Sequence, residues 1–275
     1  MTYAWLIDTT KCMACFDCVV ACKDEYVDNA WLPYSEAQPA TGQFWMNLVV
    51  NERGQLPGKI RVNNFPFLCN HCTTAPCQTA ATGGAVYTRS DGLVIIDPAK
   101  SKGQQQIVAA CPYNVIYWNA TLGIPQKCTG CAHLLDNGWT QPRCVGTCPT
   151  GAIQWGTLAT LQSQITALGA KVWHPEFNIG PQVYYVGAGA QGLVFIAGAL
   201  YASSNDAAIQ GATVTVTAGS TNLTTTSDIF GDFWVDGLAA NTSYTVTITA
   251  TGHTTVTKTV STSSGSQDLG DIAMS

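Results

Sequence analysis

All twelve cysteines of this 275-residue chain lie within its first 148 residues, and their spacing is the feature best suited to chemistry. The first group is a Cys-x2-Cys-x2-Cys-x3-Cys run and the second is Cys-x2-Cys-x4-Cys; one cysteine then precedes a proline, and two spaced pairs follow. In chain order they are Cys12, Cys15, Cys18, Cys22, Cys69, Cys72, Cys77, Cys111, Cys128, Cys131, Cys144 and Cys148. A loop with a cysteine at every third position can reach three corners of an iron–sulfur cubane, while the fourth corner needs a ligand from another segment. The pattern therefore predicts iron–sulfur clusters.

Two other uses of cysteine fit this spacing less well. Disulfides would suit an even count, but tandem Cys-x2-Cys pairs make poor bridges, and the first residues have neither the charged start nor the apolar core of a secretion signal. Zinc sites usually combine two Cys-x2-Cys pairs a dozen or more residues apart, which only the segment from Cys128 resembles. Three separate groups that suit clusters favour the iron–sulfur interpretation over both alternatives.

Four short segments around these cysteines carry a family resemblance. They are Cys-x2-Cys-x2-Cys-Val-Val-Ala-Cys-Lys from residue 12, Cys-Asn-His-Cys-x2-Ala-Pro-Cys from 69, Ala-Ala-Cys-Pro-Tyr from 109 and Lys-Cys-x-Gly-Cys from 127. Together they resemble the electron-transfer subunits of the dimethyl-sulfoxide-reductase family over about residues 1–187. The resemblance implies two fused ferredoxin units with [4Fe–4S] clusters. It also implies a large partner subunit that holds molybdenum or tungsten on two pterin guanine dinucleotides and carries the catalysis.

The same resemblance implies which cysteines share a cluster. In ferredoxin-type proteins the fourth cysteine of one run ligates the cluster of the other run. Crossed in this way, the twelve cysteines hold three [4Fe–4S] clusters: Cys12, Cys15, Cys18 and Cys148; Cys22, Cys128, Cys131 and Cys144; and Cys69, Cys72, Cys77 and Cys111. The alternative is that each run closes on itself, although the isolated Cys111 requires a distant partner in either case.

Four ligands of the family pattern are missing from this chain. The second run of the family ends in a cysteine followed by proline, where this chain has Ala81 and Thr82. The other three expected positions, counted back from Cys111, are Ser101, Gln104 and Ile107. Under the crossed arrangement these four positions belong to a single cluster. The loss of one complete set, with the others intact, supports the crossing and predicts three clusters instead of four.

The sequence changes character after residue 187. From about Gly192 threonine is abundant, charge is scarce, and apolar residues alternate with threonine, as in Ser243-Tyr-Thr-Val-Thr-Ile-Thr. About seven short strands separated by turn residues predict an all-β sandwich or barrel. The pattern resembles carboxypeptidase-regulatory-like domains of prealbumin type. We therefore expect an α+β protein, with a duplicated bacterial-ferredoxin-like iron–sulfur domain over residues 1–187 and an all-β domain over residues 192–275.

Three local patterns add to this architecture. Apolar residues near 44–51 and 59–62 predict a hairpin that turns near Gly54. Leucine and isoleucine at helical spacing over 158–168 predict a helix that Gly169 ends. The apolar stretch 183–200 is long enough to span a bilayer, but its glycines and β-branched residues favour strand, turn and strand. No membrane anchor is therefore expected.

Composition limits the function. The net charge is −5, no basic run is present, and only 11% of residues are charged against about 25% in typical proteins. This excludes a nucleic-acid partner and suggests a surface covered by a protein partner. No nucleophile–base set or phosphate-binding loop is present, so no catalytic residue is expected. His71 lies between two candidate ligands and could tune a cluster, but we expect it to be bonded to backbone or solvent.

These features predict the iron–sulfur subunit of a cytoplasmic molybdopterin enzyme complex. The missing cluster and the β-domain are most similar to a hydroxyl-transferring member of the family, in which no net electrons leave the complex. The alternative is an electron-transfer subunit of another soluble molybdenum or tungsten oxidoreductase. A third possibility is a binding module whose clusters are structural.

Overall fold

The computed structural model describes residues 1–54, 58–187 and 193–275, which form two compact units. One unit contains Met1–Val50 and Asn64–Ala188, and the other contains Asn51–Asn63 and Gly189–Ser275. The predicted domain boundaries at residues 187 and 192 stay a prediction. In the structure, the segment Asn51–Asn63 belongs to the C-terminal unit, although it precedes most of the N-terminal unit in the sequence. The predicted turns after Gly54 and within 183–200 include residues 55–57 and 188–192, which lie outside the described residues.

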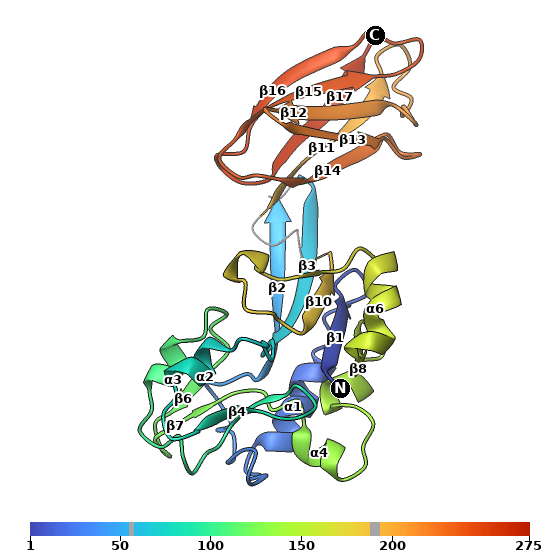
Figure 1. Ribbon diagram of the computed structural model, residues 1–275. Coiled ribbons are helices and arrows are strands. Elements are labelled where there is room, and N and C mark those ends of the chain that lie inside the picture. The colour runs from blue at the N-terminus through green and yellow to red at the C-terminus, as the bar shows by residue number, and fades with distance from the viewer. Residues whose placement is uncertain (55–57, 188–192) are drawn as a thin grey trace. The chain divides into compact units, whose positions relative to one another are not determined.

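The first and last segments of the N-terminal unit share one sheet (Figure 1). Strand β1 (Tyr3–Asp8) lies between β8 (Ile153–Thr157), which is antiparallel to it, and β10 (Val183–Val186), which is parallel to it. A short strand, β9 (Lys171–Val172), completes the order β8-β1-β10-β9. A 3-10 turn, η1 (Pro175–Phe177), lies between β9 and β10.

The two faces of β1 bury different residues because side chains alternate along a strand. Ala4 and Leu6 pack against Leu161 and Ile165 of helix α6 (Leu158–Ala167). Trp5 and Ile7 join the core that contains the cysteines. Helix α6 confirms the predicted helix: Thr157 caps its start by accepting from the backbone N–H of Thr160, and Gly169 follows its end with a φ of +59°.

The cysteine-bearing segments are short helices and two-stranded ladders joined by tight loops. The helices are α1 (Asp17–Tyr26), α2 (Pro76–Ala80), α3 (Gln106–Ala109), α4 (Ala132–Asp136) and α5 (Arg143–Gly146). The ladders are β4 (Val86–Thr88) with β5 (Val94–Ile96), and β6 (Tyr117–Asn119) with β7 (Ile124–Gln126). Short elements of this kind leave loops free to surround a cofactor.

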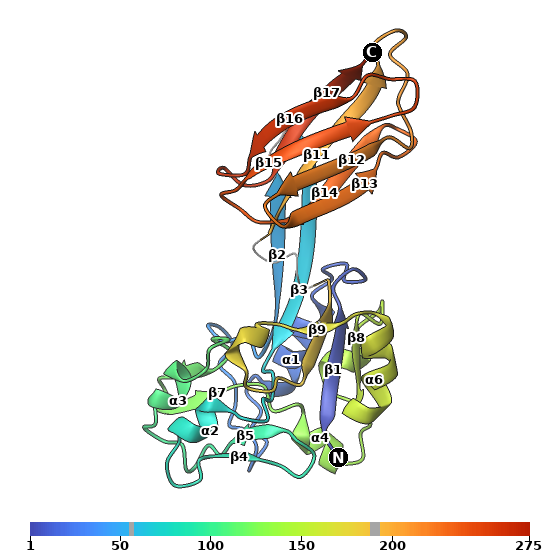
Figure 2. The same ribbon diagram turned by 45° about the horizontal axis from the view of Figure 1, so that its top comes forward.

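The C-terminal unit is a sandwich of two sheets (Figures 1 and 2). Its strands are β11 (Val194–Ala202), β12 (Thr213–Ala218), β13 (Thr221–Thr226), β14 (Asp232–Leu238), β15 (Ser243–Thr249), β16 (Val256–Ser261) and β17 (Gln267–Met274). One sheet has the order β14-β11-β17 and the other β13-β12-β15-β16. Alternate residues such as Val214, Val216, Val246 and Ile248 form the core. The predicted all-β domain is confirmed.

The hairpin of β2 (Met46–Gly54) and β3 (Ile60–Leu68) supplies charge to the C-terminal unit. Residues 189–275 contain six aspartates, no glutamate, no arginine and one lysine. Arg53 donates from Nη1 and Nη2 to the two carboxylate oxygens of Asp236 at 2.8 and 3.1 Å, and from Nη1 to the Leu193 carbonyl at 2.9 Å. Lys59 pairs with Asp232 at 2.6 Å. The hairpin thus neutralises acidic residues of the sandwich.

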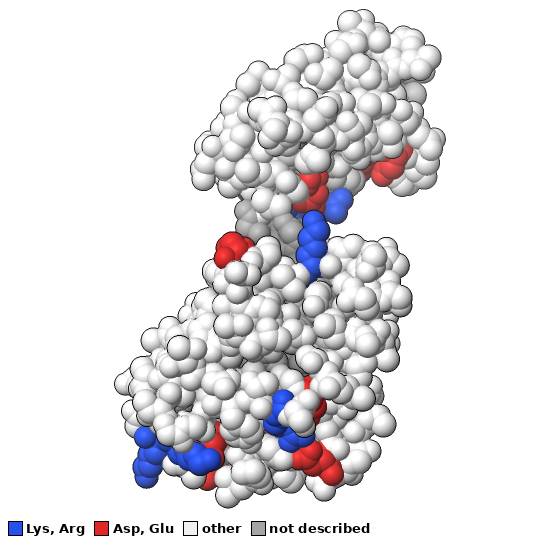
Figure 3. Space-filling model, in the orientation of Figure 1, with Lys and Arg blue, Asp and Glu red and all other residues white. Residues whose placement is uncertain are grey.

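Charged side chains are scarce over the visible face of the molecule (Figure 3). This agrees with a charged fraction of 11%. Among the described residues, no helix combines the length and the apolar character needed to span a bilayer.

Candidate iron–sulfur sites

The first candidate site brings together Cys12, Cys15, Cys18 and Cys148. These four residues line one hollow together with Leu48, Pro66 and Ile153. The loop before α1 winds tightly because Ala14 and Phe16 adopt left-handed backbone angles, with φ of 56° and 63°. Cys148 follows α5, so this hollow joins residues more than a hundred positions apart. Cys15 is exposed, whereas Cys18 is buried.

The second candidate site brings together Cys69, Cys72, Cys77 and Cys111. All four are buried and line a hollow whose other walls include Pro76, Val94, Pro112, Val115 and Ile116. Pro76 starts α2, and Ala75 before it has extended angles, because a proline disfavours helical angles in the residue that precedes it. The isolated cysteine of the sequence therefore finds its three neighbours in the preceding run.

The third candidate site brings together Cys22, Cys128, Cys131 and Cys144, all of them buried. Burial raises the pKa of Cys144 well above its ordinary value, and Cys131, Cys128 and Cys22 raise it further because they lie close by. Cys22 comes from α1, Cys131 begins α4 with a φ of 53°, and Cys144 lies in α5. Two of the predicted sets thus each line one hollow, and the electrostatics indicate that the thiols of the third set lie near one another. Iron ligation by these sets stays a prediction.

The electrostatics of these sets suit a cationic cofactor. Burial, followed by the neighbouring thiols, raises the pKa of Cys18 to about 12. Burial likewise raises the pKa of Cys77 to about 11 and that of Cys128 to about 12. In the Cys22 set all four thiols are buried and have raised pKa values. Because a thiolate is the form that ligates iron, these thiols need a positively charged group among them to act as ligands.

Backbone amides reinforce the sulfur positions. The His71 N–H donates to Cys69 Sγ at 3.5 Å, and the Gly130 N–H donates to Cys128 Sγ at 3.3 Å. Amide donors near the sulfur ligands of a cluster stabilise negative charge and tune its potential. No three His, Cys, Asp or Glu side chains of the described ranges converge on a single metal-ion position, while the hollows at Cys12 and Cys69 each have four cysteines in their walls. The residues present therefore fit iron–sulfur clusters.

His71 itself is held by the backbone. The Val94 N–H donates to His71 Nδ1 at 3.0 Å, and the ring stacks on Trp5 with 5.1 Å between centroids. Burial, and then the charge of Lys127, lowers the pKa of His71 well below its ordinary value. The side chain is neutral, and the predicted backbone-bonded histidine is confirmed.

The four positions of the missing set hold ordinary protein contacts. Ser101 and Ile107 are fully buried. Gln104 Oε1 accepts from the Thr82 N–H at 2.8 Å, while its Nε2 donates to the carbonyls of Thr82 at 3.2 Å and Lys100 at 2.8 Å. Hydrogen bonds therefore join the segments beside Ala81 and before Cys111, where the family pattern would place a cluster.

Two features near the third site were not foreseen from the sequence. His133, for which no partner was apparent, bonds through Nε2 to Glu25 Oε1 at 2.8 Å, and Arg143 Nε lies 3.2 Å from the other Glu25 oxygen. Lys127 is buried and donates to the carbonyls of Val94 and Cys128. The only sequence signal for the buried lysine was its place directly before Cys128 in a chain with little charge.

Comparisons with known proteins agree with this picture. Residues 60–158 match the family described as 4Fe-4S dicluster domain, and residues 196–275 match the carboxypeptidase regulatory-like domain. The sequence is 36% identical over 278 residues to the pyrogallol hydroxytransferase small subunit of Pelobacter acidigallici, covering 99% of each protein. It is 34% identical to a tetrathionate reductase subunit of Salmonella typhimurium, over 67% of this protein and 72% of that one. It is 29% identical to an anaerobic dimethyl sulfoxide reductase subunit of Escherichia coli, over 61% and 80% respectively.

Proposed function

We propose a function that starts from the family of this protein. It belongs to the family of iron–sulfur subunits that includes the small subunit of pyrogallol hydroxytransferase. It is accordingly an iron–sulfur, electron-transfer subunit of a molybdoenzyme complex. The specific reaction that we propose for the complex is hydroxyl transfer between pyrogallol and phloroglucinol with a tetrahydroxybenzene co-substrate. The observation that carries this proposal is the 36% identity along 99% of both proteins, because the alignment includes the β-domain as well as the cysteines.

The chain contributes clusters, and a large partner subunit contributes the molybdenum site on two pterin guanine dinucleotides. Three [4Fe–4S] clusters occupy the three cysteine sets, ligated by Cys12, Cys15, Cys18 and Cys148, by Cys22, Cys128, Cys131 and Cys144, and by Cys69, Cys72, Cys77 and Cys111. When bound, such clusters take up and release electrons one at a time. The protein residues hold the iron, exclude water by burial and donate backbone N–H groups to the sulfurs. No catalytic residue is proposed on this chain.

The proximity of the three sets supports an internal electron route. Cys18 of the Cys12 set and Cys22 of the Cys22 set lie about one turn apart on α1. Lys127 donates to the carbonyl of Cys128, in the Cys22 set, and to that of Val94, which lines the hollow of the Cys69 set. The route that we propose therefore runs from the Cys12 set through the Cys22 set to the Cys69 set.

The outer end of this route is the docking face that we propose for the molybdenum subunit. Around the exposed Cys15, the side chains of Met13, Phe16 and Val20 are 64%, 41% and 63% exposed. Apolar side chains clustered at a redox site favour a protein partner over solvent. We place the complex in the cytoplasm, where a reducing environment keeps twelve free cysteines available for iron.

The test uses the native complex, purified without oxygen. Pyrogallol and a catalytic amount of tetrahydroxybenzene are added with no electron acceptor, and the products are followed by chromatography. Accumulation of phloroglucinol supports the proposal. The proposal fails if none forms while an added dye is reduced with another substrate.

That second result would identify a conventional electron-transfer subunit, which is the alternative function. The similarity to subunits of tetrathionate reductase and dimethyl sulfoxide reductase favours this alternative. The measurement that separates the two functions is electron exchange between the complex and an external acceptor during turnover.

A further inference from the structure

Lys127 is an unusual residue because its ammonium group is buried beside cysteines. Its exposed fraction is 3%, and Nζ donates to the carbonyl oxygens of Val94 and Cys128. Burying an ammonium group is costly unless hydrogen bonds and opposite charge compensate. In the described part of the chain no carboxylate oxygen lies within 4.0 Å of it. The compensating charge must come from the sulfur groups.

The position of Lys127 links two of the cysteine sets. Val94, whose carbonyl accepts from Nζ, also lines the hollow at Cys69, and Cys128 belongs to the neighbouring set. Lysine is ordinarily a cation at neutral pH, and the two carbonyl oxygens accept from the N–H groups of this ammonium.

The position of this cation favours two of the three sets. Its two carbonyl partners belong to Val94, which lines the hollow at Cys69, and to Cys128 of the Cys22 set. The hollow at Cys12 is lined by other residues, which include neither Lys127 nor its two partners. The charge is thus placed beside the Cys69 and Cys22 sets.

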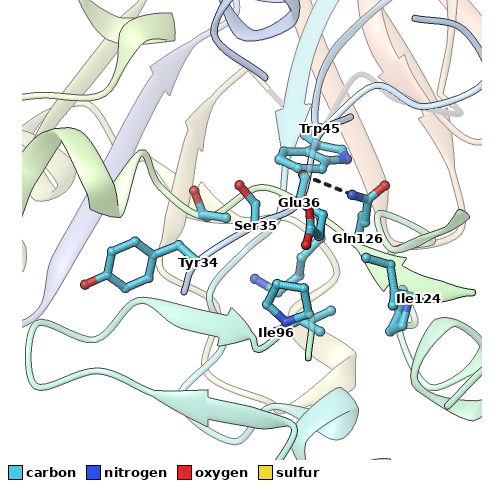
Figure 4. A pocket seen from close by; sticks show the side chains of 11 residues that line it. Tyr34, Ser35, Glu36, Trp45, Ile96, Ile124 and Gln126 are labelled. Atoms are coloured by element: carbon cyan, nitrogen blue, oxygen red, sulfur yellow. Dashed lines mark hydrogen bonds between the residues drawn. The ribbon is translucent and has the colours of Figure 1, made fainter. Parts of the chain in front are cut away.

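The surroundings of Lys127 give its charge a strong effect. The residue lines a small cavity with Ser35, Trp45 and Gln126 (Figure 4). The cavity volume is about 10 Å³, which is near the lower limit for a single water. Glu36 lines the same cavity without forming an ion pair to Lys127. Charges interact more strongly where so little solvent can screen them.

We propose that the fixed charge of Lys127 raises the reduction potentials of the clusters held by the Cys69 set and the Cys22 set, and acts less on the cluster held by the Cys12 set. This inference rests on the proposed ligand sets. Because reduction adds a negative charge, a cation between two clusters stabilises their reduced states. Lys127 is then a positioning residue that helps to retain electrons on the clusters of the Cys69 and Cys22 sets. Such retention suits a reaction in which no net electrons leave the complex.

The test is a redox titration of the complete complex, followed by electron paramagnetic resonance, in wild type and Lys127→Met. We expect the equilibrium constant for reducing two of the three clusters to fall at least tenfold, a downward shift of about 59 mV for a one-electron couple. The third cluster should shift less and serves as an internal reference. Lys127→Arg should retain the wild-type potentials, and Lys102→Met controls for the loss of an exposed lysine.

Lys127→Gln separates charge from hydrogen bonding, because an amide can donate to the same carbonyls without a positive charge. The proposal predicts that Gln behaves like Met. It is overturned if the Met and Gln variants keep full iron and sulfide content with unshifted potentials, or if Gln behaves like wild type. It is also overturned if both neutral variants lose clusters, since Lys127 would then serve assembly. A wild-type complex with fewer than three clusters would instead refute the ligand sets.

Discussion

Asp236→Ala should destabilise the C-terminal unit by leaving a buried arginine without its partner. The Arg53 side chain is 7% exposed and that of Asp236 is 29% exposed, with bidentate contacts at 2.8 and 3.1 Å. After the substitution, Arg53 keeps the Leu193 carbonyl and the ring of Phe195, whose centroid lies 5.8 Å from the guanidinium. Removing one member of a buried ion pair costs about 3–5 kcal/mol of stability. Because Asp236 is partly exposed, we expect a loss of about 3 kcal/mol, at the lower end of this range.

Amide hydrogen exchange of the intact complex measures this effect locally. Exchange in β11 and β14 should accelerate by about a hundredfold, because 1.4 kcal/mol corresponds to a factor of ten. Asp271→Ala is the matched control: Asp271 is an exposed aspartate of β17, and its removal should change exchange little. The double variant Arg53→Met with Asp236→Leu should recover much of the lost stability, since apolar replacement of a buried pair is often nearly neutral. A change below about 1 kcal/mol for Asp236→Ala would refute the reasoning.

Three further outcomes are expected. Val20→Glu should weaken binding of the molybdenum subunit at least tenfold, or about 1.4 kcal/mol, because it puts a charge into the apolar face around Cys15. A titration of one subunit with the other measures this change. Leu168→Glu, at an exposed position at the end of α6, is the control and should leave binding unchanged. Gln104→Ala should destabilise its segment by about 1–2 kcal/mol through lost hydrogen bonds, seen as faster local amide exchange, with Gln105→Ala as control. Burial raises the pKa of Asp236, but Arg53 outweighs burial and holds that pKa below its ordinary value. The ion pair therefore contributes its full stability above about pH 3.9, and this contribution is lost as pH falls through the lower pKa of Asp236 in the folded state. The free energies of unfolding of wild type and Asp236→Ala should therefore converge in acid.

The features that could be predicted from the sequence are those encoded by short spacing. Cysteine intervals indicated loops around a cofactor, and alternation of threonine with apolar residues indicated the strands of the sandwich, as at Ser243–Thr249. The signal for the helix that ends before Gly169 also came from residues close together in the sequence. Each of these signals needs only a few neighbouring residues, because side-chain period and turn chemistry act over that range.

The features that escaped prediction depend on partners distant in the chain. Arg53 bonds to Asp236 across 183 positions, so that no local pattern could assign Arg53 to the C-terminal unit. Glu25 bonds to His133 across 108 positions. Lys127 is adjacent to Cys128 in sequence, but its hydrogen bond to the carbonyl of Val94 joins residues 33 positions apart. Such charges can be placed only when the packing of separate segments is known.

The placement of β1 between β8 and β10 has a consequence for biosynthesis. Trp5 pairs with Trp155 on one side and with Val183 on the other, so the first strand cannot find its neighbours until nearly the whole N-terminal unit has been synthesised. The same delay applies to the proposed Cys12 set, which lacks Cys148 in any shorter nascent chain. Pairing over such sequence separations is slow, because the closure entropy of the long loop opposes it. The cluster proposed for the Cys12 set can therefore be completed only late, after synthesis has passed Cys148, and Cys12, Cys15 and Cys18 remain without their fourth partner until then.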